Sequence, residues 1–321
     1  MSAAPQPGVG VLRRTPGVTI LDVRELEWEP APAIAPGALR KPLGGEGDEP
    51  SACLLFLPPG YPAAADAVRS APAPADELVY TLAGDLATRE FDGPADGLGR
   101  LVQHRPGVFV QRRPGTASAP VAEPASGTGW IGLVVRDSVG GGAAVGGSAV
   151  GAAIAAGAPA PPGAVTIVDA RRADWQPLGY GALPSVFQKP LAHYPCGDPK
   201  AQLLFFPPGL DPGRSPDEHP SYPPVLRAAR HTHHRMIELL YVLDGDMPLS
   251  EWESVEQQQG ERAWWREGFF LYRRPGSIHG AEPGETSVAG VTILHFRLGG
   301  SADPGGPAFP EEIEVDIPFV R

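Results

Sequence analysis

Short apolar runs separated by turn residues are the dominant pattern along this chain. Residues 54–57 read LLFL and residues 291–294 read VTIL, and both runs are rich in aliphatic, β-branched or aromatic side chains. Glycine and proline, 41 and 40 residues respectively, supply most of the breaks between such runs. Short runs of this kind, bounded by turn signals, are typical of β-strands. Long amphipathic helical patterns are absent, so the sequence predicts an all-β protein.

The same succession of runs occurs twice, which indicates an internal duplication. VTILD at 18–22 matches VTIVD at 165–169 with an offset of 147 residues, and LLFLPPG at 54–60 matches LLFFPPG at 203–209 with an offset of 149. ELVYTLAG at 77–84 matches ELLYVLDG at 238–245 with an offset of 161. We therefore expect one domain at 1–136 and a second at 164–321, with about twelve extra residues before 231. The Gly/Ala-rich stretch 137–163 is expected to be a flexible linker, too weakly apolar to span a membrane.

Composition and charge narrow the functional classes. The chain has 321 residues, of which 42% are hydrophobic, enough to form packed cores in two domains. Its formal net charge of −11 argues against nucleic acid as a partner, because phosphate binding requires clustered Lys and Arg. The first residues do not form a basic stretch followed by an apolar core, so we expect no secretory signal. The two cysteines, Cys53 and Cys196, have no disulfide or metal spacing, and a reducing cytoplasm is expected.

A group of histidines and one carboxylate in the second copy points to a metal site. His231 and His233 are two residues apart, so on a β-strand both side chains face the same way. Glu238 opens the next predicted strand, and His279 follows a predicted turn at Pro275. Imidazole together with carboxylate suits one divalent transition metal: Fe, Mn, Ni, Cu, Co or Zn, with Fe or Mn favoured.

At these residues the chain resembles the cupin superfamily, whose motifs read G-x5-H-x-H-x3,4-E-x6-G and G-x5-P-x-G-x2-H. Three positions depart from the pattern: Val225 replaces a glycine, Arg274 takes a proline position with Pro275 one step later, and Pro283 stands where asparagine is common. None of them removes a ligand. The resemblance implies two tandem antiparallel β-barrels of the jelly-roll (double-stranded β-helix) type, a bicupin. It also implies His231, His233, Glu238 and His279 as the metal ligands.

The first copy has lost the histidines. The offset of 161 residues places Ser70, Pro72 and Ser118 where His231, His233 and His279 stand, and only Glu77 retains a ligand type, opposite Glu238. A lone carboxylate binds a transition metal poorly, so we expect one metal per chain, in the second barrel. The first barrel is expected to be a scaffold.

The residues around the metal are only partly defined by the sequence. In the predicted strand at 268–274 one face carries Phe270, Tyr272 and Arg274, and the other carries Phe269, Leu271 and Arg273; the sequence does not decide between the two faces. The candidate pocket residues are Phe270, Tyr272, Arg274 and His295. The insertion at 210–230 could form a lid over the pocket, or an ordinary surface loop.

The resemblance implies an enzyme site of the quercetin-dioxygenase type. The first hypothesis is a metal-dependent oxygenase that uses dioxygen on a small organic substrate, with Glu238 loosening from the metal to act as base. One alternative is a non-oxidative metal enzyme, such as an isomerase, decarboxylase or C–C lyase. Another is a binding protein that senses a ligand or a metal. A monomer or homodimer without a membrane partner is expected.

Overall fold

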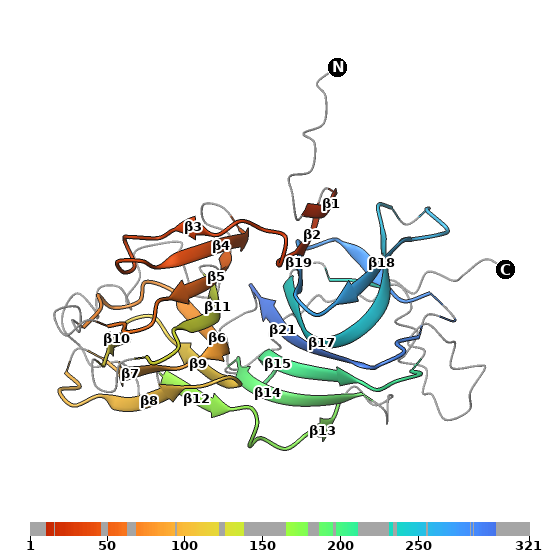
Figure 1. Cartoon of the computed structure of the whole chain (residues 1–321). Helices are drawn as coiled ribbons and strands as arrows, with labels where there is room; N and C mark the ends of the chain where they lie inside the picture. The colour runs from red at the N-terminus through yellow and green to blue at the C-terminus, as the bar shows by residue number, and fades with distance from the viewer. Residues whose placement is uncertain are drawn as a thin grey trace, which may run out of the picture. The chain divides into compact units, whose positions relative to one another are not determined.

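Every element in the described part of the chain is a β-strand, which confirms the all-β expectation (Figure 1). The chain folds into two compact units, Glu27–Ala173, called here the first barrel, and Met1–Leu26 with Asp174–Arg321, called here the second barrel. No helix among the described residues has the length and apolarity that a membrane crossing requires. The computed structural model describes residues 11–15, 17–45, 51–62, 69–93, 95–121, 126–137, 165–178, 186–194, 197–210, 231–233, 236–254, 256–282, 284 and 286–299.

The first barrel contains two antiparallel sheets. The larger sheet has the order β12 (Val165–Asp169), β9 (Val108–Arg112), β6 (Asp76–Gly84), β11 (Trp130–Asp137), β5 (Ser51–Leu57), β4 (Leu39–Gly44) and β3 (Glu29–Pro30). The smaller sheet has the order β10 (Ala117–Pro120), β7 (Leu86–Phe91) and β8 (Arg100–His104). Two facing sheets of this kind form the jelly-roll barrel expected from the sequence.

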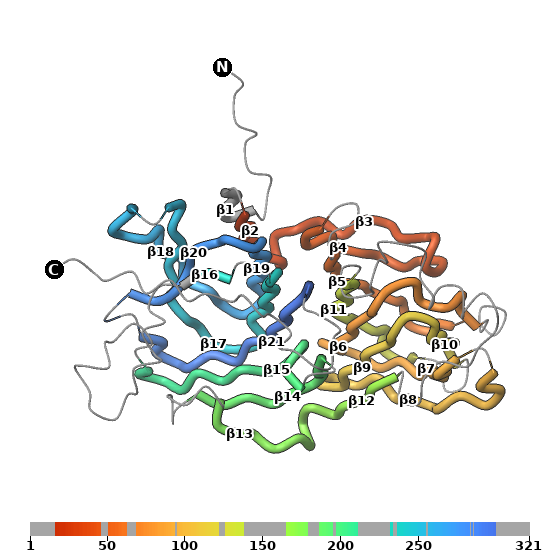
Figure 2. The backbone as a smooth tube through the Cα atoms, turned by 180° about the vertical axis from the view of Figure 1, so that it is seen from behind, coloured from red at the N-terminus to blue at the C-terminus, as the bar shows by residue number. Residues whose placement is uncertain are grey.

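The second barrel repeats this plan around one long strand. The main path runs β1 (Val11–Thr15), β2 (Val18–Asp22), β19 (Phe269–Arg273), β17 (Ile237–Trp252), β21 (Val291–Leu298), β15 (Pro199–Phe206), β14 (Phe187–His193) and β13 (Gln176–Pro177). The far half of β17 pairs with β18 (Glu261–Arg266) and β20 (Ile278–Gly280), and β20 pairs in turn with β16 (His231–Thr232) (Figure 2). β17 therefore runs through both parts of this 11-stranded sheet, whereas its counterpart in the first barrel is divided into β6 and β7.

Each barrel takes up chain from the other half of the sequence: β1 and β2 belong to the second barrel, and β12 belongs to the first. β2 pairs with β19, with Ile20 opposite Leu271, and β12 pairs with β9, with Ile167 opposite Val110. The spatial division therefore departs from the expected boundaries of 1–136 and 164–321. Two of the exchanged strands, β2 and β12, are the matching VTILD and VTIVD segments of the repeat. Because they are nearly identical, each presents the same apolar pattern to the edge strand that accepts it.

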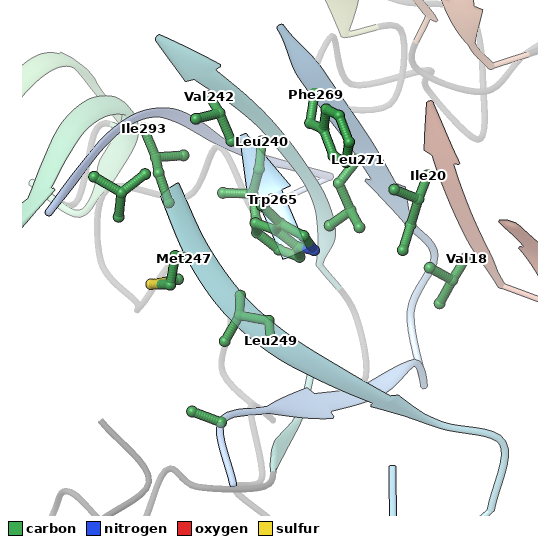
Figure 3. Close-up of a cluster of buried hydrophobic side chains, with 12 residues drawn as sticks. Val18, Ile20, Leu240, Val242, Met247, Leu249, Trp265, Phe269, Leu271 and Ile293 are labelled. Atoms are coloured by element: carbon green, nitrogen blue, oxygen red, sulfur yellow. The ribbon is translucent and has the colours of Figure 1, made fainter. Parts of the chain in front are cut away.

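The exchanged strand contributes to the interior of the second barrel. Val18 and Ile20 pack with Leu240, Trp265 and Leu271 in one buried cluster (Figure 3). In Figure 3 the side chain of Leu271 on β19 lies between Ile20 of β2 and the ring of Trp265. These contacts identify the face of β19 that points into the barrel.

The duplication extends to individual side-chain hydrogen bonds. Ser126 donates to Asp85 over 3.2 Å in the first barrel, and Ser287 donates to Asp246 over 3.1 Å in the second. Both pairs lie beside a glycine of positive φ, Gly84 or Gly245, at the point where the strand leaves the large sheet. The two barrels are thus copies of one design, and their differences are informative about the site.

Candidate metal centre

The short strand β20 brings the two metal-binding motifs together. His279 on β20 is paired with His231 on β16, and on its other side with Glu251 on β17. The backbone N–H of Gly276 donates to the carbonyl of His233 over 2.7 Å, so the turn before β20 is tied to the segment that follows His231. The side chain of His231 lies outside the described residues, and its assignment as a ligand remains a prediction.

Three potential metal ligands converge in the described residues. The donor atoms of His233, Glu238 and His279 all lie within 4.8 Å of one another. Nε2 of His279 is 3.4 Å from Oε2 of Glu238, and the rings of His233 and His279 have centroids 5.3 Å apart. Glu238 and His279 are buried. Two ligands on opposite sides of a transition metal ion are roughly 4.2 Å apart, so this group fits a single ion after small side-chain movements.

Glu238 is held as a carboxylate by its neighbours. Burial opposes its ionisation, but the charge of the buried Arg273 and the contacts with His279 and His295 outweigh burial and hold the pKa of Glu238 well below its ordinary value. A deprotonated carboxylate is the form that binds metal. The site therefore presents a ligand-competent Glu238 at neutral pH.

Arg273 links Glu238 to a second buried carboxylate. Its guanidinium contacts Glu238 and also donates to Oε1 of Glu251, with Nη2 at 2.5 Å and Nε at 3.1 Å. All three side chains are almost fully buried. The two carboxylates and one guanidinium give the cluster a net charge of −1, which favours a cation at the adjacent histidines.

His295 contacts the same carboxylate from β21. Its Nε2 lies 3.0 Å from Oε1 of Glu238, and its Nδ1 lies 3.1 Å from the amide nitrogen of Gln202 on β15. Burial lowers the pKa of His295, and the neutral ring bridges Gln202 and Glu238. His295 thus belongs to the site, as a contact of a candidate ligand.

The structure places the other three candidate pocket residues elsewhere. Phe269 and Leu271 belong to the interior cluster, and Arg273 on the same face contacts Glu238. Phe270 and Tyr272 therefore lie on the opposite face of β19, where they are buried. Arg274 is exposed, and its backbone N–H donates to the carbonyl of Gly17. Both faces of this strand are apolar, so alternation in the sequence could not distinguish them.

Sequence reasoning missed Arg273 and Glu251, although the repeat contains a signal for both. The offset of 161 residues that relates Glu77 to Glu238 also relates Arg112 to Arg273 and Glu90 to Glu251. In the first barrel Arg112 donates to Glu77 over 2.6 Å and to Glu90 over 2.7 Å. Three charged residues retained at one offset in two apolar barrels indicate a shared buried network.

The matching region of the first barrel has kept the backbone pairing but not the imidazoles. Ser70 and Ser118 replace His231 and His279, and the N–H of Ser70 donates to the carbonyl of Ser118 over 2.7 Å. Glu77 forms ion pairs with Arg112 and with Arg136, whose Nε lies 3.1 Å from Oε2 of Glu77. Among the described residues of this barrel no three metal donors come together. The expectation that the metal lies in the second barrel is consistent with this arrangement.

Two further expectations fall almost entirely outside the described residues: the possible lid at 210–230, of which only Leu210 is described, and the linker at 137–163, of which only Asp137 is described. They stay predictions from the sequence.

Comparisons with known proteins identify the fold. No protein-family model matches the sequence, and no curated protein matches it. Among solved structures, the chain is similar to protein Ylba from E. coli, with a TM-score of 0.54, 10% identity and coverage of 90% of this chain and 94% of that one. It is also similar to HEPD of Streptomyces albus, determined with 2-hydroxyethylphosphonate and Fe(II) bound, with a TM-score of 0.55, 15% identity and coverage of 90% and 77%.

Proposed function

We propose that the second barrel of this cupin-like chain is a metal-dependent oxygenase acting on a small organic substrate. The observation that supports the proposal is the convergence of His233, Glu238 and His279 within 4.8 Å in the barrel interior. Similarity to HEPD, whose structure contains Fe(II), supports a metal enzyme of this fold. The oxygenase activity itself is the part we propose.

In this proposal His231, His233, Glu238 and His279 bind the metal. His231 lies on β16, directly opposite His279 on β20, so its backbone is adjacent to one of the described ligands. A divalent ion with three neutral imidazoles and one carboxylate would supply Lewis acidity and open coordination positions for an anionic substrate oxygen and for dioxygen.

Glu238 acts here as a ligand held in place, and Arg273 and His295 are its positioning residues. His295 engages Oε1 of Glu238, while Arg273 and His279 lie against Oε2. With both oxygens engaged, the carboxylate has little freedom to swing toward a substrate as a base. Partners of this kind fix the orientation of metal ligands, and their loss typically weakens metal binding 10- to 100-fold.

The walls of the second barrel around this site are apolar. Leu240 follows Glu238 on the same face of β17, and Leu271 precedes Arg273 on the same face of β19. Both side chains are buried, so the surroundings of the ligands on these two strands are apolar. A substrate with an apolar body and one anionic oxygen fits such surroundings.

The first experiment is the metal content of the whole chain, purified anaerobically without chelator and measured by mass spectrometry. About one transition metal per chain is expected, with a loss in His279→Ala, because that variant removes an inner ligand. Ser118→Ala is the matched control at the equivalent position of the first barrel and should keep its metal. Unchanged metal in His279→Ala would overturn the assignment.

A second measurement tests whether the metal has a coordination position that is open to dioxygen. Nitric oxide, a stable analogue of dioxygen, is added to the Fe(II)-loaded protein under anaerobic conditions and the electron paramagnetic resonance spectrum is recorded. A new high-spin signal, absent from His279→Ala, supports an open position that dioxygen can reach. A metal-loaded protein with no response to nitric oxide would favour non-oxidative catalysis or ligand sensing over oxygenation.

A further inference from the structure

The first barrel contains a partly open cavity of about 730 Å³, although this barrel has no histidine cluster among its described residues. Binding pockets for small organic molecules typically measure about 300–1,000 Å³. The walls of the cavity are mainly apolar, and the polar side chains Thr88, His104 and Arg112 also line it. The apolar wall includes Leu57, Val79, Leu86, Trp130 and Val134, which also form one buried cluster.

The two barrels differ at the positions that shape this space. At the offset of 161 residues, Thr88 and His104 of the first barrel correspond to Leu249 and Trp265 of the second. Leu249 and Trp265 are buried members of the apolar cluster of the second barrel. The first barrel therefore has smaller and more polar side chains where its copy has a hydrophobic core. A purely structural barrel would gain stability from filling this space.

The hydrogen bonds around His104 fix which of its nitrogens carries the proton. Thr88 donates its hydroxyl proton to Oε1 of Glu90 over 2.6 Å. Glu90 accepts as a carboxylate: burial opposes its ionisation, but the hydrogen bonds and charge of Arg112 lower its pKa well below the ordinary value. Nε2 of His104 lies 2.7 Å from the same Thr88 oxygen, so it must be the donor in that contact.

The other nitrogen of His104, a residue of the cavity lining, is then an acceptor. Burial lowers the pKa of His104, so the ring is neutral and Nδ1 keeps its lone pair. Within the described residues, Nδ1 is buried and has no hydrogen-bond partner. His104 itself is 1% exposed. A buried acceptor without a partner is unfavourable, and a bound molecule that donates a hydrogen bond would satisfy it.

The charged residues of the lining argue for a neutral ligand. Arg112 is occupied by Glu77 and Glu90, and Arg136 also pairs with Glu77. Arg69 donates to the backbone carbonyls of Gly93 and Asp96. All three arginines are thus engaged, and an anion would have to break existing contacts to bind them.

We propose that the cavity of the first barrel binds a small neutral molecule with an apolar body and one hydroxyl or N–H group, which donates to Nδ1 of His104. Aromatic alcohols have this chemistry, because the ring packs against Trp130 and the aliphatic wall while the hydroxyl reaches His104. The chain then contains two sites of different character, a metal centre in one barrel and a metal-free pocket in the other.

A pair of probes that differ only in the donor tests this site. 1-Naphthol has a hydroxyl, and 1-methoxynaphthalene has the same ring without a donor. Binding of each to the whole chain is measured by isothermal titration calorimetry. We expect 1-naphthol to bind about tenfold more tightly, the effect of one additional hydrogen bond. In His104→Leu both probes should bind with similar affinity.

Two further variants locate the binding. Ala73→Trp, at a half-buried position of the cavity lining, should abolish binding of both probes by occupying the space. His279→Ala, in the other barrel, should leave binding unchanged, which separates this site from the metal centre. The proposal is overturned if Ala73→Trp retains binding, if His279→Ala loses it, or if the wild-type chain does not distinguish the two probes. Ala73→Trp keeps the test decisive if His104→Leu does not fold.

Discussion

Arg112 donates a 2.6 Å hydrogen bond to Glu77 in the first barrel, where serines replace two of the histidines. The same pair recurs in the second barrel as Arg273 and Glu238, beside the histidines. A third residue, Glu90 or Glu251, completes each network. Because the network exists in both copies, its presence does not depend on metal. We infer that it supports the barrel interior and that the second copy uses it in addition to position a metal ligand.

Replacing Arg112 or Arg273 with methionine should destabilise the corresponding barrel by similar amounts. Each change leaves two buried carboxylates without their cation, and removal of one partner from a buried pair typically costs about 3–5 kcal/mol in the free energy of unfolding. Urea unfolding in the presence of a chelator measures both variants without a contribution from metal.

Arg136→Ala is the control for this prediction. Arg136 pairs with the same Glu77 over 3.1 Å, but its side chain is 62% exposed. Exposed ion pairs contribute roughly 0–1 kcal/mol, so this variant should unfold almost like the wild type. A large loss in Arg136→Ala, or none in Arg112→Met, would contradict the role we assign to the buried network.

Glu90 should make the stability of the first barrel depend on pH. Burial opposes its ionisation, but Arg112 holds the pKa of Glu90 below that of an unfolded glutamate, about 4.3. A pKa lowered by folding stabilises the protein fully above the unfolded value, and this contribution is lost as the pH falls below it. The difference in unfolding free energy between wild type and Glu90→Gln should be largest at pH 7 and shrink below pH 4.3 or so.

The control for the pH dependence is Glu29→Gln on the surface. Glu29 lies 3.6 Å from Arg40, and both side chains are more than half exposed. Glu29→Gln should have nearly the same free energy of unfolding as the wild type at every pH, because exposed ion pairs contribute little. A difference between wild type and Glu90→Gln that stays constant from pH 7 to pH 3 would show that the lost contact is not electrostatic.

The sequence predicts much of this fold because the duplication repeats the pattern of several strands in both halves of the chain. The strands at 54–57 and 77–84 and their counterparts at 203–206 and 238–245 follow from matched apolar runs. The strand exchange does not, because the VTILD and VTIVD segments have nearly the same pattern and fit either edge. The sequence also does not show which face of β19 points into the barrel, because Phe270 on one face is as buried as Leu271 on the other. The sequence therefore does not identify Arg273 as a contact of Glu238.

His295 should affect metal affinity without being an inner ligand. Its Nε2 lies 3.0 Å from Oε1 of Glu238, so His295→Ala removes one of the groups that orient this carboxylate. A loss of roughly 10- to 100-fold in affinity for Mn(II) is expected, measured by competition with a chelator of known affinity. Thr292→Ala, on the same strand but the opposite face, should bind Mn(II) like the wild type. Equal affinity in His295→Ala would remove His295 from the site.

Gly245 should tolerate a methyl group less well than Gly276, although both have positive φ. At Gly276, with φ of 85°, a Cβ would meet nothing within 4 Å, so Gly276→Ala should cost roughly the 1–2 kcal/mol of a left-handed alanine. At Gly245, with φ of 82°, a Cβ would lie 1.9 Å from the carbonyl oxygen of Gly290. Gly245→Ala therefore adds a backbone clash to the same strain, and it should lower the midpoint of thermal unfolding by clearly more. Equal midpoints for the two variants would mean that the chain segments around Gly245 and Gly290 can separate without loss of stability.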